Sequence, residues 1–342
     1  MIVVLKPNVS EEDLQGFLAM LKSRGLDTHL SQGENTTIVG LVGDTISINE
    51  KSLEVHSLVS KVMRVQEPYK KANRKFNPED SIFAIPHQAE GKDFLIGSNR
   101  LAVMAGPCSV EGHEHLLGLA KSIKASGAQF LRGGVFKPRT SPYSFQGLGA
   151  EGMRIMEAVK KETGLPIVTE LMAAKHLDEF NDVDIIQIGA RNMQNFDLLK
   201  ELGGCKNTIL LKRGLSATIK EFLMSAEYIM ASGNNNVILC ERGIRTYDNY
   251  TRNTLDISAV PFLKKESHLP VIIDPSHACG ISWMIEPLAK AAVAVGADGL
   301  MIEVHDNPPM AWSDGEQCVT PAEFDDIMKK VKAFAAVDGK TL

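Results

Sequence analysis

The sequence predicts an α/β protein in which a small N-terminal domain of ferredoxin-like βαββαβ order precedes a (β/α)8 TIM barrel. Between residues 101 and 306 there are eight apolar runs separated by amphipathic segments. Eight such units over about 240 residues are the number and size typical of a barrel. Each run ends in a residue that can bind a metal or an anion. Because a parallel barrel gathers its strand ends at one mouth, this regularity favours closure over a doubly wound open sheet.

The first 67 residues are expected to form the ferredoxin-like domain. Residues 2–5 are β-branched and apolar, as in a strand, and Ser10 begins a helix that ends at Gly25. Further strands are predicted at 28–30 and 36–42, then a helix near 52–59 and a strand at 62–65. The polar segment 68–88 is expected to be a linker, and the barrel is expected to occupy 89–342.

The eight barrel strands are predicted where apolar residues run together, at 101–108, 130–136, 166–171, 185–190, 208–213, 237–242, 271–275 and 299–304. Amphipathic helices are expected between them. The clearest helix places six apolar residues on one face: Ile219, Phe222, Leu223, Ala226, Ile229 and Met230. The last helix is expected to begin at Pro321.

Composition excludes several classes of protein. The chain has 342 residues and a formal net charge of −5, which argues against a general nucleic-acid binder or a protein of anionic membrane surfaces. No apolar stretch reaches the roughly 18 residues of a membrane span. The five cysteines form no Cys-x-x-Cys pair, so free thiols in the reduced cytoplasm are expected.

Four potential metal ligands lie at or after predicted strand ends. Cys108 follows the first strand, His277 the seventh and Glu303 ends the eighth, while Asp314 lies in the next loop. Barrel closure would place these strands side by side. One sulfur, one imidazole and two carboxylates suit a divalent transition metal such as Mn, Fe, Co or Zn, whereas a thiolate argues against Mg²⁺ or Ca²⁺. The alternative is a structural role for each, with Cys108 as a small buried hydrophobe.

Two residues near these ligands are not expected to bind the metal themselves. Asp274 is expected to orient His277, because a metal-bound histidine usually donates its second ring N–H to a carboxylate or carbonyl group. His305 lies two residues beyond Glu303 and is expected to be only a neighbour of the site.

Seven cations also fall on or just after predicted strand ends, too many for Glu170, Glu241 and Asp274 to neutralise: Arg132, Lys137, Arg139, Arg191, Lys212, Arg213 and Arg242. Desolvated cations without partners are costly, so this mouth is expected to bind phosphorylated substrates. The alternative is that the side chains extend into solvent. The loop 137–147, stiffened by Pro138 and Pro142, is rich in phosphate-binding residue types. The G-x-G-x-x-G match at 147–152 follows a loop, not a strand, and is weak evidence for a dinucleotide site.

These motifs, in this order, closely resemble those of the 3-deoxy-D-arabino-heptulosonate 7-phosphate (DAHP) synthases, in the short microbial form with an N-terminal ferredoxin-like domain. The segments that carry the resemblance are 105–109, 137–141, 187–191, 211–213, 240–242, 274–277 and 303–305. The resemblance covers the whole chain. It implies condensation of phosphoenolpyruvate with erythrose 4-phosphate and water, the first step of aromatic amino acid biosynthesis through the shikimate pathway.

The resemblance also implies site residues. The metal would be held by Cys108, His277, Glu303 and Asp314. Phosphoenolpyruvate would be bound by Arg132, Lys137, Ala190, Arg191, Lys212 and Arg242. Erythrose 4-phosphate would be bound by Arg139, Thr140, Ser141 and Asp274. The catalytic residues would be Cys108, Lys137, His277 and Glu170, and the sequence leaves open whether Glu170 or a metal-bound water handles the proton of the attacking water.

Three alternatives stand beside this reading. The first is a 3-deoxy-D-manno-octulosonate 8-phosphate synthase, which would use arabinose 5-phosphate; its acceptor loop resembles Lys-Ala-Asn-Arg-Ser, whereas this chain has Lys-Pro-Arg-Thr-Ser at 137–141. The second is an aldolase that forms a Schiff base on Lys212. The third is a non-catalytic amino-acid sensor, which would leave the barrel mouth unexplained.

The small domain is expected to regulate the enzyme. The segment 28–31 resembles the feedback site of the inhibited forms, in which His29 and Ser31 would help to bind an aromatic amino acid. The alternative is that the domain only covers the barrel or builds an oligomer. By resemblance alone, a homotetramer or homodimer is expected.

Overall fold

The structure, a computed structural model, describes residues 1–342 except 34–35, 44, 46–47, 65–67 and 139–140. Its contacts divide the chain into two compact units, Met1–Pro68 and Tyr69–Leu342. Each unit has a hydrophobic core of its own. Among the described residues, no helix has both the length and the apolar character needed to cross a bilayer. The five cysteines are free thiols, as expected.

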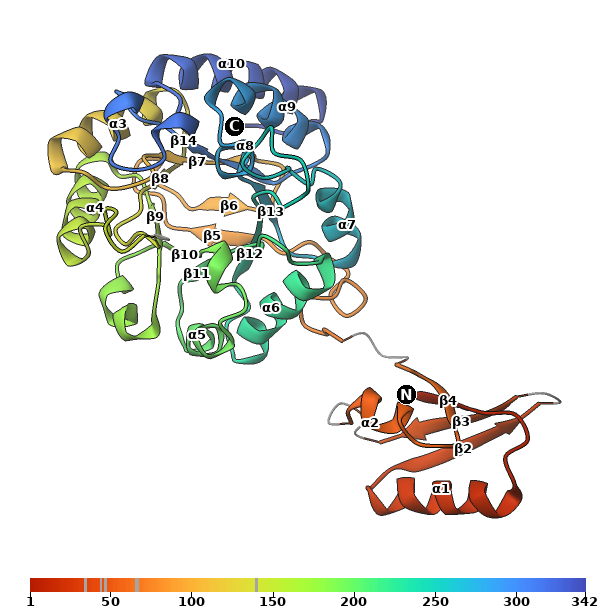
Figure 1. The fold of residues 1–342 in the computed structure, drawn as a ribbon. Helices are drawn as coiled ribbons and strands as arrows, with labels where there is room; N and C mark the ends of the chain where they lie inside the picture. Colours follow the sequence, from red (N-terminus) through yellow and green to blue (C-terminus); the bar gives the residue numbers. More distant parts are fainter. Residues whose placement is uncertain (34–35, 44, 46–47, 65–67, 139–140) are drawn as a thin grey trace. The chain divides into compact units, whose positions relative to one another are not determined.

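The first unit is a four-stranded antiparallel sheet with two helices, so the expected βαββαβ order is confirmed (Figure 1). Its spatial strand order is β2-β3-β1-β4. Ser10 caps the first helix by accepting a hydrogen bond from the backbone N–H of Asp13. The elements are β1 Ile2–Leu5, α1 Glu11–Ser23, β2 Asp27–Gln32, β3 Thr37–Val42, α2 Glu50–Glu54 and β4 Val59–Met63.

The second unit is a closed barrel of eight parallel strands, as predicted; Figure 1 shows the strands as an inner ring and the helices around them. The strands are β7 Ala102–Gly106, β8 Phe130–Arg132, β9 Ile167–Glu170, β10 Ile185–Ile188, β11 Thr208–Lys212, β12 Val237–Glu241, β13 Val271–Ile273 and β14 Gly299–Glu303. Every strand residue is buried, which explains the continuous apolar runs in the sequence.

The helices follow the strands in the regular β/α order, with short 3-10 turns between some of them. Thr218 and Thr320 begin the two helices that the sequence identified best, each with a complete capping box. The helices are α3 His113–Ala125, α4 Ala150–Thr163, α5 Phe196–Glu201, α6 Ile219–Ala231, α7 Ala259–Glu266, α8 Pro275–Cys279, α9 Ile285–Ala294 and α10 Pro321–Val337.

The closing strand pair places the first, seventh and eighth barrel strands side by side, as expected. β14 pairs with β7, so that Glu303 lies opposite Gly106, and β13 pairs with β14 on the other side. Gly106 has φ of 145°, and a Cβ atom there would collide with the carbonyl oxygen of Arg132. The chain therefore needs glycine immediately before Pro107 and Cys108.

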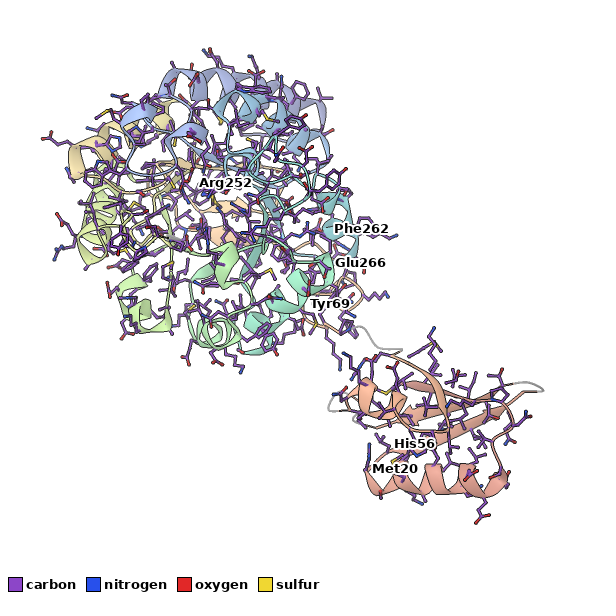
Figure 2. The ribbon with its side chains drawn as sticks, in the orientation of Figure 1. Met20, His56, Tyr69, Arg252, Phe262 and Glu266 are labelled. Atoms are coloured by element: carbon purple, nitrogen blue, oxygen red, sulfur yellow. The ribbon has the colours of Figure 1, made fainter. Side chains whose placement is uncertain are left out.

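The segment expected to be a linker, 68–88, differs from that expectation. From Tyr69 onward it belongs to the barrel unit, and Tyr69 lies beside Glu266 of α7, to which its hydroxyl donates a 3.5 Å hydrogen bond (Figure 2). A short hairpin of β5 Phe83–Ile85 and β6 Phe94–Ile96 packs edge-to-face against the barrel through Phe94 and Phe130. Phe130 begins its strand, so the hairpin lies at the N-terminal end of the barrel and leaves the opposite mouth uncovered.

Candidate active site

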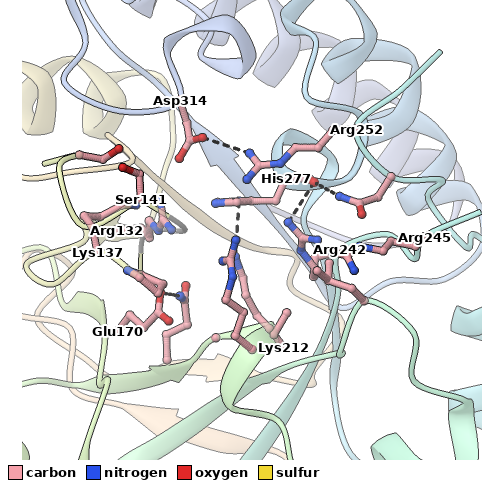
Figure 3. A pocket seen from close by; sticks show the side chains of 18 residues that line it. Arg132, Lys137, Ser141, Glu170, Lys212, Arg242, Arg245, Arg252, His277 and Asp314 are labelled. Carbon is pink, nitrogen blue, oxygen red and sulfur yellow. Dashed lines mark hydrogen bonds and ion pairs between the residues drawn. The ribbon is translucent and has the colours of Figure 1, made fainter. Parts of the chain in front are cut away.

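A cavity of about 400 Å³ lies at the C-terminal ends of the barrel strands. Seven lysine or arginine side chains line it, against the carboxylates of Glu170 and Asp314. Figure 3 labels all of these except Arg191 and shows the labelled side chains converging from both sides. The cations are Arg132, Lys137, Arg191, Lys212, Arg242, Arg245 and Arg252. The predicted concentration of positive charge at one mouth is therefore found, and its chemistry suits anionic ligands.

Beside this cavity, the ligand atoms of Cys108, His277 and Glu303 all lie within 4.8 Å of one another. Within this group, His277 Nε2 and Glu303 Oε1 lie 3.3 Å apart. Asp314 completes the group, because the Cys108 thiol donates a 2.9 Å hydrogen bond to its Oδ2 atom. Asp314 has φ of 53° and ψ of 33°, a left-handed conformation that aspartate tolerates better than most residues. The structure thus brings together all four residues proposed as metal ligands.

This donor set fits a divalent transition metal. Burial lowers the pKa of His277 to about 4, so its imidazole is neutral near pH 7, which is the form that binds metals. Burial alone would raise the pKa of Glu303, but His277 and Arg132 outweigh that effect and hold it at about 2. Burial raises the pKa of the Cys108 thiol to about 12. A cation would have to displace the thiol proton, so metal binding should release a proton here.

The sequence Asp274-Pro275-Ser276-His277 explains how the imidazole is aimed. Asp274 caps α8, accepting a 2.9 Å hydrogen bond from the backbone N–H of His277, and proline suits the first helical position. Its second oxygen lies 2.7 Å from His277 Nδ1. Because Nδ1 is held by this carboxylate, Nε2 faces Glu303. Asp274 is fully buried and also pairs with Lys212 at 2.5 Å. The structure therefore supports the orienting role of Asp274, and its contact with erythrose 4-phosphate stays a prediction.

Glu303 is held from both sides. Arg132 forms a buried ion pair with its Oε1 atom, and Gln317 donates a 2.5 Å hydrogen bond to its Oε2 atom. The amide oxygen of Gln317 in turn accepts from Arg252, which also pairs with Asp314. Gln317 therefore links two of the four candidate ligands. Sequence reasoning missed Gln317, Arg245 and Arg252 because they lie in loops beyond the apolar runs.

The remaining cations differ in how far they are already neutralised. Arg242 donates to the carbonyl oxygen of His277 at 3.1 Å, while its Nη1 atom is buried with no hydrogen-bond partner in the described part of the chain. Such an orphaned donor at a cavity wall is an anion-binding group. Lys137 Nζ contacts the Cys108 sulfur at 2.7 Å and so connects the cavity to the four-ligand group. Arg213 is different: it pairs with Glu241 and Asp256 and does not line the cavity, contrary to expectation.

Glu170 lies at the end of β9 and lines the cavity, where Gln187 donates a 3.2 Å hydrogen bond to it. A Cβ atom at Gly189 would collide with the Glu170 carboxylate, which explains the glycine in the segment 187–191. Ala190 and Arg191, next in this segment, line the cavity as expected.

The remaining predicted residues are those expected to bind erythrose 4-phosphate and those expected to bind a regulatory amino acid. Of the expected erythrose 4-phosphate ligands, Ser141 lines the cavity, whereas Arg139 and Thr140 lie outside the described residues. His29 and Ser31 lie on β2, the edge strand of the first unit, exposed and two residues apart, so they share one face of the sheet. Their regulatory role stays a prediction.

Comparison with known proteins agrees with this geometry. Residues 80–336 match the model of the DAHP synthetase I family, and residues 1–67 match the DAHP synthase ferredoxin-like domain. A phospho-2-dehydro-3-deoxyheptonate aldolase of Thermotoga maritima is 46% identical over 336 residues, covering 98% of each chain. The crystal structure of a Thermotoga maritima protein of that name superimposes with a TM-score of 0.92 at 45% identity, covering 99% of this chain and 98% of the other. A 2-dehydro-3-deoxyphosphooctonate aldolase of Arabidopsis thaliana is 34% identical, covering 69% of this chain and 88% of its own.

Proposed function

This chain belongs to the DAHP synthetase I family, and we propose that it condenses phosphoenolpyruvate with erythrose 4-phosphate and water to give DAHP and phosphate. The observation that carries the proposal is the meeting of Cys108, His277, Glu303 and Asp314 beside a cavity lined by seven cations. The reaction joins two phosphorylated substrates, so it needs both an anion-binding cavity and a group that polarises a carbonyl.

A divalent transition metal, held by Cys108, His277, Glu303 and Asp314, would supply Lewis-acid polarisation of the aldehyde oxygen. Whether the ion is manganese, iron, cobalt or zinc depends on availability as well as affinity. Around this site, Asp274 orients the His277 imidazole, and Arg132 and Gln317 fix the two oxygens of Glu303.

The carboxylate and phosphate of phosphoenolpyruvate are bound by five cations of the cavity: Arg132, Lys137, Arg191, Lys212 and Arg242. The Nη1 donor of Arg242, which has no partner among the described residues, donates to one of these anionic groups. Holding this substrate with its C3 atom toward the aldehyde of erythrose 4-phosphate turns a bimolecular step into a positioned one. Ser141 and the rest of the loop 137–141 bind the second phosphate. A bond forms between C3 and the aldehyde carbon, water adds at C2, and phosphate leaves from C2.

Glu170 accepts the proton of the attacking water in this proposal. It is the carboxylate that lines the cavity away from the four-ligand group, and its position is fixed by Gln187 and by the close approach of Gly189. A Glu170→Gln variant should keep its substrate affinities while kcat falls by roughly 100-fold, the usual size of a general-base effect. An unchanged kcat would remove Glu170 from this step.

The direct test follows the loss of phosphoenolpyruvate with either erythrose 4-phosphate or arabinose 5-phosphate. We expect turnover with the four-carbon sugar, its loss with a chelator and its return when metal is added. Turnover with arabinose 5-phosphate alone would assign the octulosonate reaction, which relatives at 30–34% identity are named for. Trapping by borohydride on Lys212 would instead support the Schiff-base aldolase, although the Lys212 amine is engaged by Asp274.

For the first unit we propose feedback regulation by an aromatic amino acid bound near His29 and Ser31. The match of residues 1–67 to the ferredoxin-like domain of DAHP synthases supports this, as do the exposed polar side chains on one face of β2. Tyrosine, phenylalanine and prephenate should be tested separately for inhibition. No effect from any of them would leave this domain with another role. We also propose a homo-oligomer, which sedimentation of the purified chain would test.

A further inference from the structure

A second group of metal-ligating side chains lies outside the site described above. The ligand atoms of Glu111, His115 and His305 lie within 4.8 Å of one another, the same closeness found for Cys108, His277 and Glu303. Glu111 belongs to the connection between β7 and α3, His115 to the first turn of α3, and His305 to the segment after β14. Two segments distant in sequence, 111–115 and the one that carries His305, are therefore brought together at one point, and the sequence had suggested His305 only as a neighbour of the main site.

Each imidazole of this group lies against a carboxylate. Asp306 Oδ1 lies 2.9 Å from His115 Nε2 and 3.2 Å from His305 Nδ1. The rings of His115 and His305 lie with their centroids 4.6 Å apart. On the far side, His305 Nε2 lies 3.4 Å from Glu111 Oε2. A carboxylate that takes one ring N–H from a histidine leaves the other nitrogen to bind a metal, and Asp306 is placed to do so for His115. His305 Nδ1 instead accepts a 3.0 Å hydrogen bond from the backbone N–H of Asn307, which an ion bound at Nε2 would have to break.

One ring nitrogen of the group has no hydrogen-bond partner among the described residues. Glu111 is held on both sides, because its Oε1 atom accepts from the backbone N–H of Trp312 at 2.7 Å and its Oε2 atom faces His305 Nε2 at 3.4 Å. When His115 donates Nε2–H to Asp306, its Nδ1 atom carries a lone pair. Nδ1 is buried and has no hydrogen-bond partner among the residues that the structure describes. Buried polar atoms are rarely left without a partner, and here two neighbouring side chains are also potential ligands.

We propose that Glu111, His115 and His305 bind a second divalent transition metal, with Asp306 orienting His115. Two imidazoles and a carboxylate match the ligand preference of zinc and its neighbours, and no thiolate is needed. Two carboxylates face two imidazoles in this group, so a divalent cation would balance the charge of Glu111 and Asp306. The side chains of His305, Glu111 and His115 are 4%, 11% and 19% exposed, whereas that of Asp306 is 59% exposed, so the ion would be partly shielded from solvent by its three ligands.

The consequence for the protein is a connection between α3 and the segment that follows β14. That segment carries His305 and, further on, Trp312 and Asp314, of which Asp314 is a ligand candidate of the main site. A bound ion would fix its start to the first turn of α3. We therefore assign the second ion a structural role and not a catalytic one.

The test counts zinc on the purified, tag-free full-length chain by equilibrium dialysis. His115→Ala should lose one zinc per chain relative to wild type, whereas His113→Ala should lose none. His113 is a matched control, since it lies two residues away in the same helix and its ring contacts Glu162 at 2.9 Å instead. Equal zinc content in the two variants would overturn the proposal.

A second measurement separates the two sites. In a Cys108→Ser background, zinc should still raise the melting temperature, and adding His115→Ala should abolish that rise. Cobalt bound at the second site should show ligand-field absorption without thiolate-to-metal charge transfer, because that site contains no sulfur. If zinc does not stabilise Cys108→Ser, or stabilises it equally without His115, this group binds no metal. Failure of the DAHP synthase reaction would leave these outcomes unaffected.

Discussion

Asp274 offers the sharpest test of how the main site is held, through the variant Asp274→Asn. The carboxylate is fully buried, 2.5 Å from Lys212 and 2.7 Å from His277 Nδ1. Burial alone would raise its pKa, but His277 and Lys212 outweigh that effect and hold the pKa well below its usual range. Asparagine keeps the shape of the side chain and an oxygen that accepts from the backbone N–H of His277. It removes the negative charge that faces Lys212 and the His277 imidazole.

Two effects of this substitution can be estimated separately. Removing one partner of a buried ion pair costs about 3–5 kcal/mol, and we expect the lower end because Lys212 also reaches the cavity. Loss of the carboxylate that orients a metal-binding histidine usually weakens metal affinity by about 10–100-fold. Asp274→Asn should therefore unfold more easily in urea and also bind manganese or zinc more weakly in chelator competition.

Asp298→Asn is the matched control for this variant. Asp298 is also a buried carboxylate that pairs with a lysine, Lys264 at 2.8 Å, and accepts a backbone N–H, that of Val271. It immediately precedes β14, so it lies at the end of the barrel opposite the mouth. The Asp298→Asn variant should therefore lose stability but keep the metal affinity of the wild type. If Asp274→Asn binds metal as tightly as wild type, or if both variants lose affinity equally, the orienting role of Asp274 is refuted.

Three further predictions concern the same site. Cys108→Ser should lose the metal of the main site and its activity, while its free energy of unfolding without metal changes by no more than about 1 kcal/mol, since serine is nearly isosteric. An active variant that still holds a metal at the main site would exclude a thiolate role. The free energy of unfolding of the metal-free protein should fall by about 3 kcal/mol in total as pH falls from 6.5 to about 4. The reason is that the unfolded chain binds a proton on His277 in this range, whereas the buried imidazole of the folded protein stays neutral. His277→Gln should flatten that part of the pH profile, and an unchanged profile would contradict the assignment. Gly189→Ala should displace the Glu170 carboxylate and lower kcat, with an overpacking cost of about 1–3 kcal/mol in urea unfolding; wild-type kinetics would show that the position of Glu170 is unimportant.

The fold was largely predictable because barrel strands are buried on both faces. Continuous apolar runs therefore appear in the sequence, and each strand lies within its predicted range, shorter by one to four residues. Phe130–Arg132 is the extreme case: the apolar run continues to residue 136, but the strand ends at Arg132, and beyond it Gly134 forms only an isolated bridge with Ser109. The segment 69–88 was misjudged as a linker because its buried residues, such as Tyr69 and Ala72, are scattered among polar ones.

The site was predictable where ligands end strands and less so elsewhere. Barrel closure alone brings Cys108, His277 and Glu303 together, whichever loops connect them. The direction of a side chain at a strand end is harder to predict, and Arg213 turns to Glu241 and Asp256 while nearby Arg242 lines the cavity. Residues on loops, such as Arg252 and Gln317, have no periodic signal, and neither has the group of Glu111, His115 and His305.

The proposed reaction depends on Cys108 and His277 binding the same ion beside the cationic cavity. X-ray absorption of the zinc-loaded His115→Ala variant, which lacks the proposed second site, measures the ligands of that ion. We predict one sulfur at about 2.3 Å together with nitrogen or oxygen ligands at about 2.0–2.2 Å, and loss of the sulfur signal in Cys108→Ser. A zinc shell with no sulfur, or one whose sulfur persists in Cys108→Ser, would contradict the claim.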